Sequence, residues 1–121
     1  MVDILSFISD KLTGAGIPYE YEEWTQAVTY PYFVGSYTET DYRYEDDCTT
    51  GTFTIDGWAR ESKLSLIEVV DTLKEMFGDL QEVVNDEVTF FIRYGGSQTV
   101  PSGEEGLFHV TVTLYASSWN T

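Results

Sequence analysis

Residues 52–60 alternate between apolar and polar side chains with the period of a β-strand. Phe53, Ile55, Gly57 and Ala59 fall on one side, and threonines with Asp56 fall on the other. This alternation is typical of a sheet with one buried face and one polar face. Trp58 interrupts the polar side, which suggests that this side meets a partner.

Three further segments have the composition of strands. Residues 30–38 are rich in aromatic and β-branched side chains and carry Pro31 at their start, where a missing N–H is tolerated. Residues 88–94 and 108–116 each place apolar side chains at every second position. Residues 17–24 are predicted to be extended, because Pro18 disfavours a helix there.

Two segments have helical periodicity. Residues 2–13 form a short helix in this prediction, ended by Gly14 and Gly16. Residues 64–77 give the stronger signal, with an apolar stripe widened by Ile67, Val69 and Met76. Ser65 and Glu68 fit a capping box, and Gly78 fits a left-handed residue after the helix end. The stripe itself is made by Leu66, Val70, Leu73 and Phe77.

The element order is helix, strand, strand, helix, strand, strand. It predicts one α+β domain over residues 1–121, with an antiparallel sheet of four to five strands and two helices packed on one face. Residues 39–50 and 95–106 are then two unusually long, polar connections. Because a hairpin needs only about two to five loop residues, connections of this length indicate a function or disorder.

The net charge is −15, from 21 acidic and 6 basic residues. Such a chain repels nucleic acid, since nucleic-acid binding depends on lysine and arginine neutralising phosphates, and it also repels anionic membrane surfaces. Three interpretations remain open: simple solubility, a surface past which DNA slides without sticking, or a mimic of the charge of DNA.

Catalytic groups are scarce in the sequence. His109 lies inside the last strand without a second histidine, which favours a hydrogen-bonded structural role. Cys48 stands in an acidic loop that disfavours its thiolate, and a single cysteine forms no internal disulfide. The acidic residues 41–47 lack the ligand spacing of an EF-hand loop. The sequence therefore predicts no catalytic residues, no cofactor and no metal, and a function that is not enzymatic.

The first residues have no basic start and no long apolar run, so no signal peptide is expected. No segment approaches the roughly 18 apolar residues of a membrane span. We therefore expect folding in a reducing cytoplasm and no membrane partner.

The segment Tyr-Pro-Tyr-Phe-Val-Gly-Ser-Tyr at residues 30–37 resembles the first strand of small tail-completion proteins from phages and prophages of Gram-positive bacteria. The second strand, which ends Gly-Trp-Ala-Arg at residues 57–60, the following amphipathic helix and the late hairpin with its glycine-rich tip are similar as well. The likeness to the tail-terminator family of long-tailed, siphovirus-like bacteriophages covers roughly residues 1–117.

The resemblance implies a structural protein of the virion, in the tail and neck, assembled in the cytoplasm of the bacterial host. It implies a homo-hexameric ring on the head-proximal end of the tail tube, which stops tube growth and joins the tail to the head connector. The partners implied are the tail tube protein and the head–tail connector protein. DNA passes through the ring without specific binding.

Candidate contact residues lie on the exposed aromatic positions and in the two long connections, which we expect to face the tube and the neck. These residues are Tyr42, Tyr44, Trp58, Gly95, Gly96, Val100, Pro101 and Tyr115.

Two alternatives remain. Another neck protein, such as a head-closure or connector-completion protein, would present similar elements. An acidic DNA mimic that inhibits a nuclease or a restriction enzyme is the alternative from another class. Mimicry needs carboxylates ordered along one face, whereas the strands carry mostly threonine on their polar sides.

Overall fold

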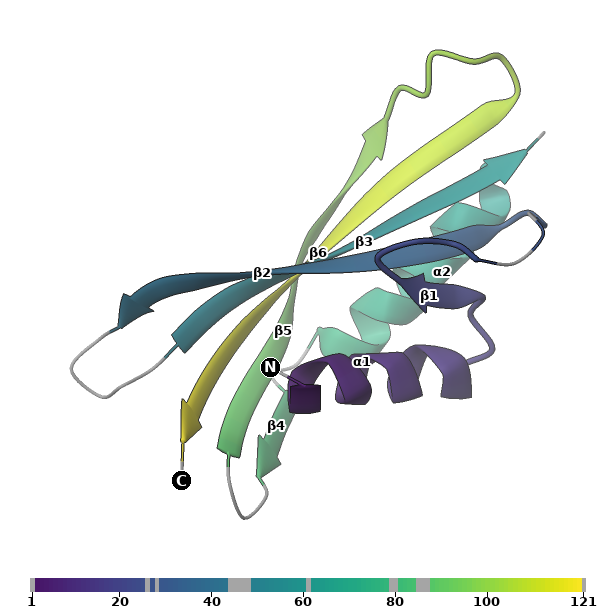
Figure 1. Ribbon diagram of the computed structural model, residues 1–121. Coiled ribbons are helices and arrows are strands. Elements are labelled where there is room, and N and C mark those ends of the chain that lie inside the picture. The colour runs from purple at the N-terminus through teal and green to yellow at the C-terminus, as the bar shows by residue number, and fades with distance from the viewer. Residues whose placement is uncertain are drawn as a thin grey trace.

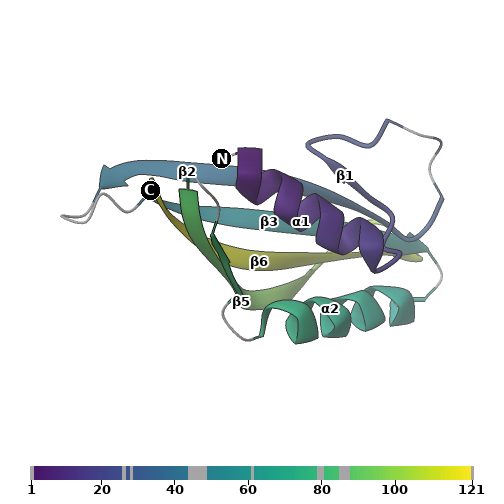
Figure 2. The same cartoon turned by 90° about the horizontal axis from the view of Figure 1, so that it is seen from below.

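The computed structural model describes residues 2–25, 27, 29–43, 49–60, 62–78, 81–84 and 88–120, with side chains not described for 2–3, 40–43, 49, 81–84, 88–89 and 119–120. One twisted sheet carries both helices on the same face (Figures 1 and 2). The elements are α1 (Val2–Gly14), β1 (Tyr19–Tyr21), β2 (Tyr32–Arg43), β3 (Thr49–Arg60), α2 (Leu64–Phe77), β4 (Gln81–Val84), β5 (Val88–Val100) and β6 (Leu107–Asn120).

The sheet has six strands in the order β1-β2-β3-β6-β5-β4. The predicted α+β class with two helices is confirmed, and the four long strands β2, β3, β6 and β5 pair antiparallel as predicted. Two short strands add to this arrangement at the edges. β4 pairs antiparallel with β5, whereas β1 pairs parallel with β2 and makes the sheet mixed.

The core lies between the sheet and the helices, and every second residue of the long strands points into it. The predicted buried side of β3 is confirmed, with Phe53 and Ile55 fully buried. Phe53 packs against three tyrosine rings, at 6.5 Å from Tyr19, 6.2 Å from Tyr21 and 6.3 Å from Tyr37. The helices contribute a further set of buried residues: Ile4, Ile8, Leu12, Leu66, Leu73 and Phe77.

Burial raises the pKa of all three tyrosine hydroxyls in this cluster, and the shift is large for Tyr37 and Tyr19. The pKa of Tyr37 rises to about 12, first because of burial and then because of the nearby Glu39 and Tyr21. The pKa of Tyr19 is also raised, chiefly by burial. A low-dielectric environment disfavours the charged phenolate, so the Tyr19 and Tyr37 hydroxyls stay neutral to a pH well above the one at which tyrosine usually ionises.

Both helices have the predicted bounds to within one residue, but the predicted caps of α2 are wrong. No side chain at Lys63, the residue before the helix, caps it; instead the Leu64 N–H donates to the Ser62 hydroxyl at 3.2 Å. Gly78 has a φ of −60°, so the left-handed ending is absent. Ile67 was expected to widen the buried stripe, yet it is 45% exposed.

The bounds of the two long connections were predicted wrongly, because the strands extend into them. β2 runs on to Arg43 and β3 begins at Thr49, while β5 runs on to Val100 and β6 begins at Leu107. Polar and glycine-containing segments have little sequence signal for a strand, but pairing with a neighbouring strand, as at Arg43 with Thr49 and from Gly96 to Val100 with β6, supplies backbone hydrogen bonds. As a result, β2 and β3 extend past the ends of both helices (Figure 2).

The extended segment predicted at 17–24 is a strand only over β1. Glu22 has a φ of 69°, a left-handed conformation that turns the chain and ends the pairing with β2. The Glu22 N–H still donates to the Gly35 carbonyl at 2.7 Å, which closes the last hydrogen bond of the pair.

Candidate interface on the open sheet face

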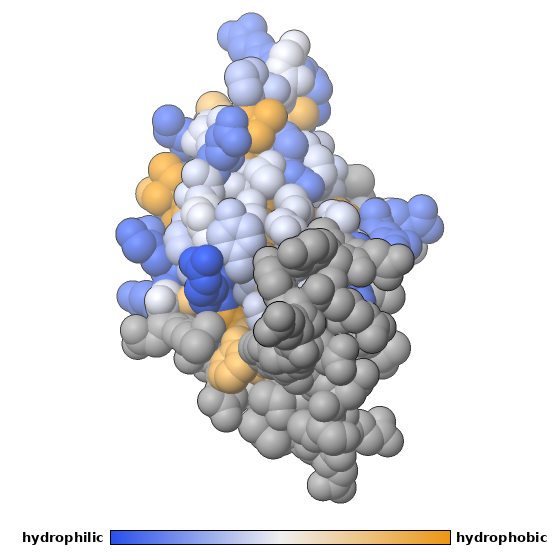
Figure 3. Space-filling model, turned by 90° about the vertical axis from the view of Figure 1, so that its left-hand side faces the viewer, coloured by the Kyte–Doolittle hydropathy of each residue, from blue (hydrophilic) through white to orange (hydrophobic). Residues whose placement is uncertain are grey.

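The face of the sheet opposite the helices carries no other layer among the described elements, and we call it the open face. Seen from the left of Figure 1, the middle of its described part has the pale shades of residues that are neither strongly hydrophilic nor hydrophobic (Figure 3). Strand register places an array of hydroxyl side chains on it: Ser36, Thr38, Thr50, Thr52, Thr54, Thr111, Thr113 and Ser117.

A row of stacked rings crosses one end of the open face. Tyr32, Trp58 and His109 lie directly opposite one another on β2, β3 and β6. The Tyr32 and Trp58 centroids are 5.2 Å apart and their planes 21° apart, and Trp58 and His109 stack at 4.6 Å and 11°. Trp24 continues the row at 5.1 Å from Tyr32. We call these four residues the aromatic ladder.

Within the aromatic ladder, Tyr32, Trp58 and His109 turn their ring faces toward one another, whereas the Trp24 ring is tilted by 42° to that of Tyr32. A sugar or a base binds an aromatic side chain through a free ring face. In the aromatic ladder, both faces of Trp58 are already occupied, by Tyr32 and by His109. With both faces of Trp58 occupied, this arrangement suits contact with another protein surface better than stacking of a small ligand.

His109 also belongs to a small polar cluster that lies beside the aromatic ladder on the same face. Its Nε2 lies 2.9 Å from Asp56 Oδ1, and the Thr111 hydroxyl donates to the same oxygen at 2.7 Å. The side chains of His109 and Asp56 are 18% and 30% exposed. This geometry agrees with the predicted structural role of His109, since its imidazole has a polar partner and a stacked ring.

At the other end of the open face, Tyr115 is held between an arginine and a glycine. The Arg93 guanidinium lies 4.9 Å from the Tyr115 ring centroid. A Cβ on Gly95 would come within 2.5 Å of the ring, so only glycine leaves room for it. A β-bulge between Tyr94 and Gly96 bends β5 at this point. A shallow groove of about 290 Å³ lies beside this group, lined among others by Thr50, Thr52, Phe91 and Ser117.

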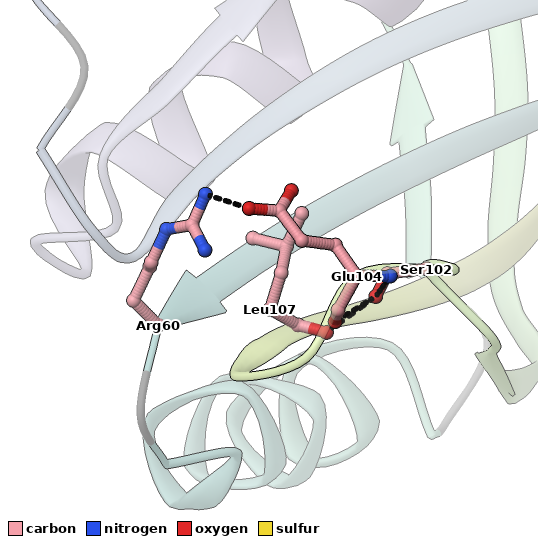
Figure 4. A network of polar contacts seen from close by, with 4 residues as sticks. All are labelled: Arg60, Ser102, Glu104 and Leu107. Atoms are coloured by element: carbon pink, nitrogen blue, oxygen red, sulfur yellow. Dashed lines mark hydrogen bonds and ion pairs between the residues drawn. The ribbon is translucent and has the colours of Figure 1, made fainter.

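The connection between β5 and β6 is fastened to the end of β3 (Figure 4). Arg60 Nη2 and Glu104 Oε1 are 2.9 Å apart, and the Arg60 guanidinium also lies 5.5 Å from the Tyr30 ring. Hydrogen bonds to Glu104 and then to Tyr30 raise the pKa of Arg60. The Ser102 hydroxyl donates to the Leu107 carbonyl at 2.6 Å, so the connection is an ordered turn.

The structure sorts the predicted contact residues into groups. Trp58 is in the aromatic ladder and Val100 lies opposite His109 in the strand register, next to Pro101 at the end of β5. Gly95, Gly96 and Tyr115 meet at the β-bulge. The remaining two were expected in a loop: the backbone of Tyr42 belongs to β2, its side chain is not described, and Tyr44 lies outside the described residues.

Three residues of the open face were missed by sequence reasoning. Tyr32 was placed in a strand without a role, although its alternation with Phe33 could have shown which face it takes. Arg93 stacks on Tyr115 across two strands, which needs the register of β5 and β6. Trp24 comes from an irregular segment, so no period in the sequence places it.

Among residues with described side chains, no group of three or more histidine, cysteine, aspartate or glutamate residues is placed to hold a metal ion. Cys48 and most of the acidic residues 41–47 lie outside the described residues. Of the described helices, none is both long and apolar enough to cross a membrane.

No protein-family model matches the chain, and no curated protein matches it.

Proposed function

We propose that this chain is a tail-assembly protein of a long-tailed phage or prophage. In this proposal it forms a ring on the head-proximal end of the tail tube, stops the growth of the tube and joins the tail to the head connector. The observation that carries the proposal is a broad open face with a single carboxylate among its described side chains, in a chain whose net charge is −15.

Acidic residues are distributed unevenly along the chain and over the fold. Of the 21 acidic residues, only Glu104 and Glu105 lie after residue 87. On the open face of the four long strands, Asp56 is the only carboxylate among the described side chains, and it is hydrogen-bonded to His109 and Thr111. Like-charged copies repel each other through their acidic surfaces. The open face is therefore where copies and partners can approach most closely.

The side chains of the open face suit a protein contact. Aromatic residues are enriched in protein interfaces, and charged residues are depleted from their centres. Trp58 and Tyr32 are half-buried, and Tyr115 is 42% exposed. Strands of 12 to 14 residues give this face a length that the helix-covered core alone does not need.

A ring also explains the sign of the charge. Contacts between different patches of identical subunits close into a ring when the rotation between subunits allows it. DNA that crosses such a ring must not bind to its wall, and carboxylates repel phosphates. We propose six copies in the ring, with the tail tube protein and the connector protein as the other partners.

The direct test is electron microscopy of particles made without this chain. We expect overlong tails, or tails not attached to heads. Normal virions would contradict the proposal.

A matched pair of variants connects the phenotype to the open face. Thr113→Lys puts a charge on the open face, and Thr13→Lys puts the same charge on the exposed surface of α1. We expect the first variant to reproduce the tail defect and the second to assemble normally, with both proteins folded by circular dichroism. If the two variants assemble equally well, the open face is not the contact surface.

A further inference from the structure

The outer edge of β5 is only half covered. β4 pairs with β5 over Thr89 to Ile92, and beyond Ile92 no described strand lies on that side. In Figure 1 the upper part of β5 forms the margin of the sheet. The backbone N–H and C=O groups that point outward from an edge strand are open to another extended chain.

Within residues 97–100, this edge lacks the features that usually protect an edge strand. Such strands are often guarded by charged side chains, by proline or by a bulge. The bulge of β5 lies at Tyr94 and Gly96, and Pro101 follows only after the strand has ended. Between them, residues 97–100 are Ser-Gln-Thr-Val, without a charge.

An exposed apolar part of α2 lies beside this edge. Leu64 is 59% exposed and Ile67 is 45% exposed, although both belong to the first turns of a helix that buries its opposite side. A small hollow of about 20 Å³ joins this part of α2 to β5, lined by Lys63, Leu66, Ile67, Thr99 and Phe108 among others. Helix and strand edge thus border one groove.

We propose that residues 97–100 of β5 and the first turns of α2 form a strand-addition groove. Its occupant is an extended segment of a partner protein, apolar at alternate positions and carrying an acidic residue next to Lys63. Adding a strand to an open edge is an established mode of peptide recognition, in which the backbone gives affinity and alternate side chains give specificity. The inference does not depend on the ring.

Each property of the occupant follows from the groove. Only an extended chain matches the outward hydrogen-bonding groups of β5. In an added strand, alternate side chains would point toward Ile67 and the others toward the side of Gln98, which requires apolar residues at every second position. Lys63 supplies a cation in the lining of the hollow, so an acidic residue fits beside it.

The probe is the blocked peptide acetyl-Glu-Val-Thr-Val-Thr-Val-amide, tested against acetyl-Glu-Thr-Thr-Val-Val-Val-amide, which has the same composition without the alternation. Amide hydrogen exchange of residues 97–100 is followed by NMR in the full-length protein. At a peptide concentration of about ten times Kd, we expect about tenfold slower exchange of the outward-pointing amides. The second peptide should have little effect.

Two variants test the groove, and one serves as control. Ile67→Lys should weaken binding of the alternating peptide about tenfold or more, whereas Thr13→Lys, with the same change of charge on α1, should leave it unchanged. Thr99→Pro blocks one N–H of the edge; if it fails to fold, Ile67→Lys and the exchange data carry the test.

Equal binding of the peptide to Ile67→Lys would overturn the inference. Slow exchange of residues 97–100 that depends on protein concentration in the absence of peptide would also overturn it, because a second copy would then occupy the edge. The proposed ring fails by a different result, normal tails in particles that lack the chain.

Discussion

The two faces of this sheet are built from neighbouring residues of the same strands and have opposite properties. Phe53 is fully buried under the helices among three tyrosine rings, while the next residue, Thr54, lies half-exposed on the open face opposite Thr113. The covered face is apolar and closed, whereas the open face is rich in hydroxyl groups and carries stacked rings. The covered face therefore supplies most of the folding stability, and the side chains of the open face are not constrained by packing against the helices.

If the proposed function holds, this difference separates folding from assembly. The residues that hold the domain together are concentrated on one side, so we expect changes on the open face to alter assembly without unfolding the protein. The following predictions test that separation, beginning with the largest expected effect.

Phe53→Ala and Thr54→Ala form the sharpest pair, because the two residues are adjacent and point to opposite faces. Phe53→Ala removes a fully buried ring and should lower the free energy of unfolding by about 3–5 kcal/mol. Thr54→Ala should change it by less than about 1 kcal/mol. Urea denaturation followed by circular dichroism gives both values. Similar losses for the two variants would mean that the open face is part of the folding core.

Trp58→Ala tests the aromatic ladder, where the ring is half-buried between Tyr32 and His109. The free energy of unfolding should fall by about 1–3 kcal/mol, from lost burial and lost stacking. A double-mutant cycle with His109→Ala should give a coupling of about 0.5–1.5 kcal/mol. A coupling near zero would show that the stacking of Trp58 on His109 adds nothing to the free energy of unfolding beyond the burial of each ring.

Alkaline pH should destabilise the covered face through Tyr37. Its pKa in the folded protein is about 12, above the ordinary value of 10.0, so the folded state disfavours the phenolate. The resulting stability is fully present below about pH 10 and is lost as the pH rises toward 12. Urea midpoints measured from pH 9 to pH 12 should therefore fall less in Tyr37→Phe than in the unsubstituted protein. Parallel curves would contradict this assignment.

The smallest effect is expected for the ion pair between Arg60 and Glu104. Both side chains are exposed, at 39% and 56%, and such pairs contribute little because solvent screens them. Glu104→Gln should leave the urea midpoint almost unchanged while hydrogen exchange in residues 101–106 becomes faster. A clear loss of global stability would show that this connection supports the core.

The sequence predicted the parts of the fold whose side chains alternate in hydrophobicity. The buried side of β3 and the bounds of α2 follow directly from periods of two and of 3.6 residues. The far ends of β2 and β5 were missed, because glycine and polar residues such as Gly95 and Gln98 carry no period there. These ends are strands because a neighbouring strand pairs with them, and pairing partners are not visible in a single segment.

The candidate interface was predictable only in part for the same reason. Trp58 stood out because it interrupts a polar alternation, and the structure places it on the polar side as predicted. The stack around it depends on the register of β2, β3 and β6, which brings Tyr32 and His109 opposite it. Residue types indicated a surface for partners, and only the register showed how its rings are arranged.

Hydroxyl-radical footprinting of Trp58 and Tyr115, compared between the free protein and assembled phage tails, tests the central claim most directly. If the open face is the assembly surface, both residues should become markedly less reactive in the tails, while exposed residues of α1 keep their reactivity. Unchanged reactivity of Trp58 and Tyr115, or tails that do not contain this chain, would contradict the account.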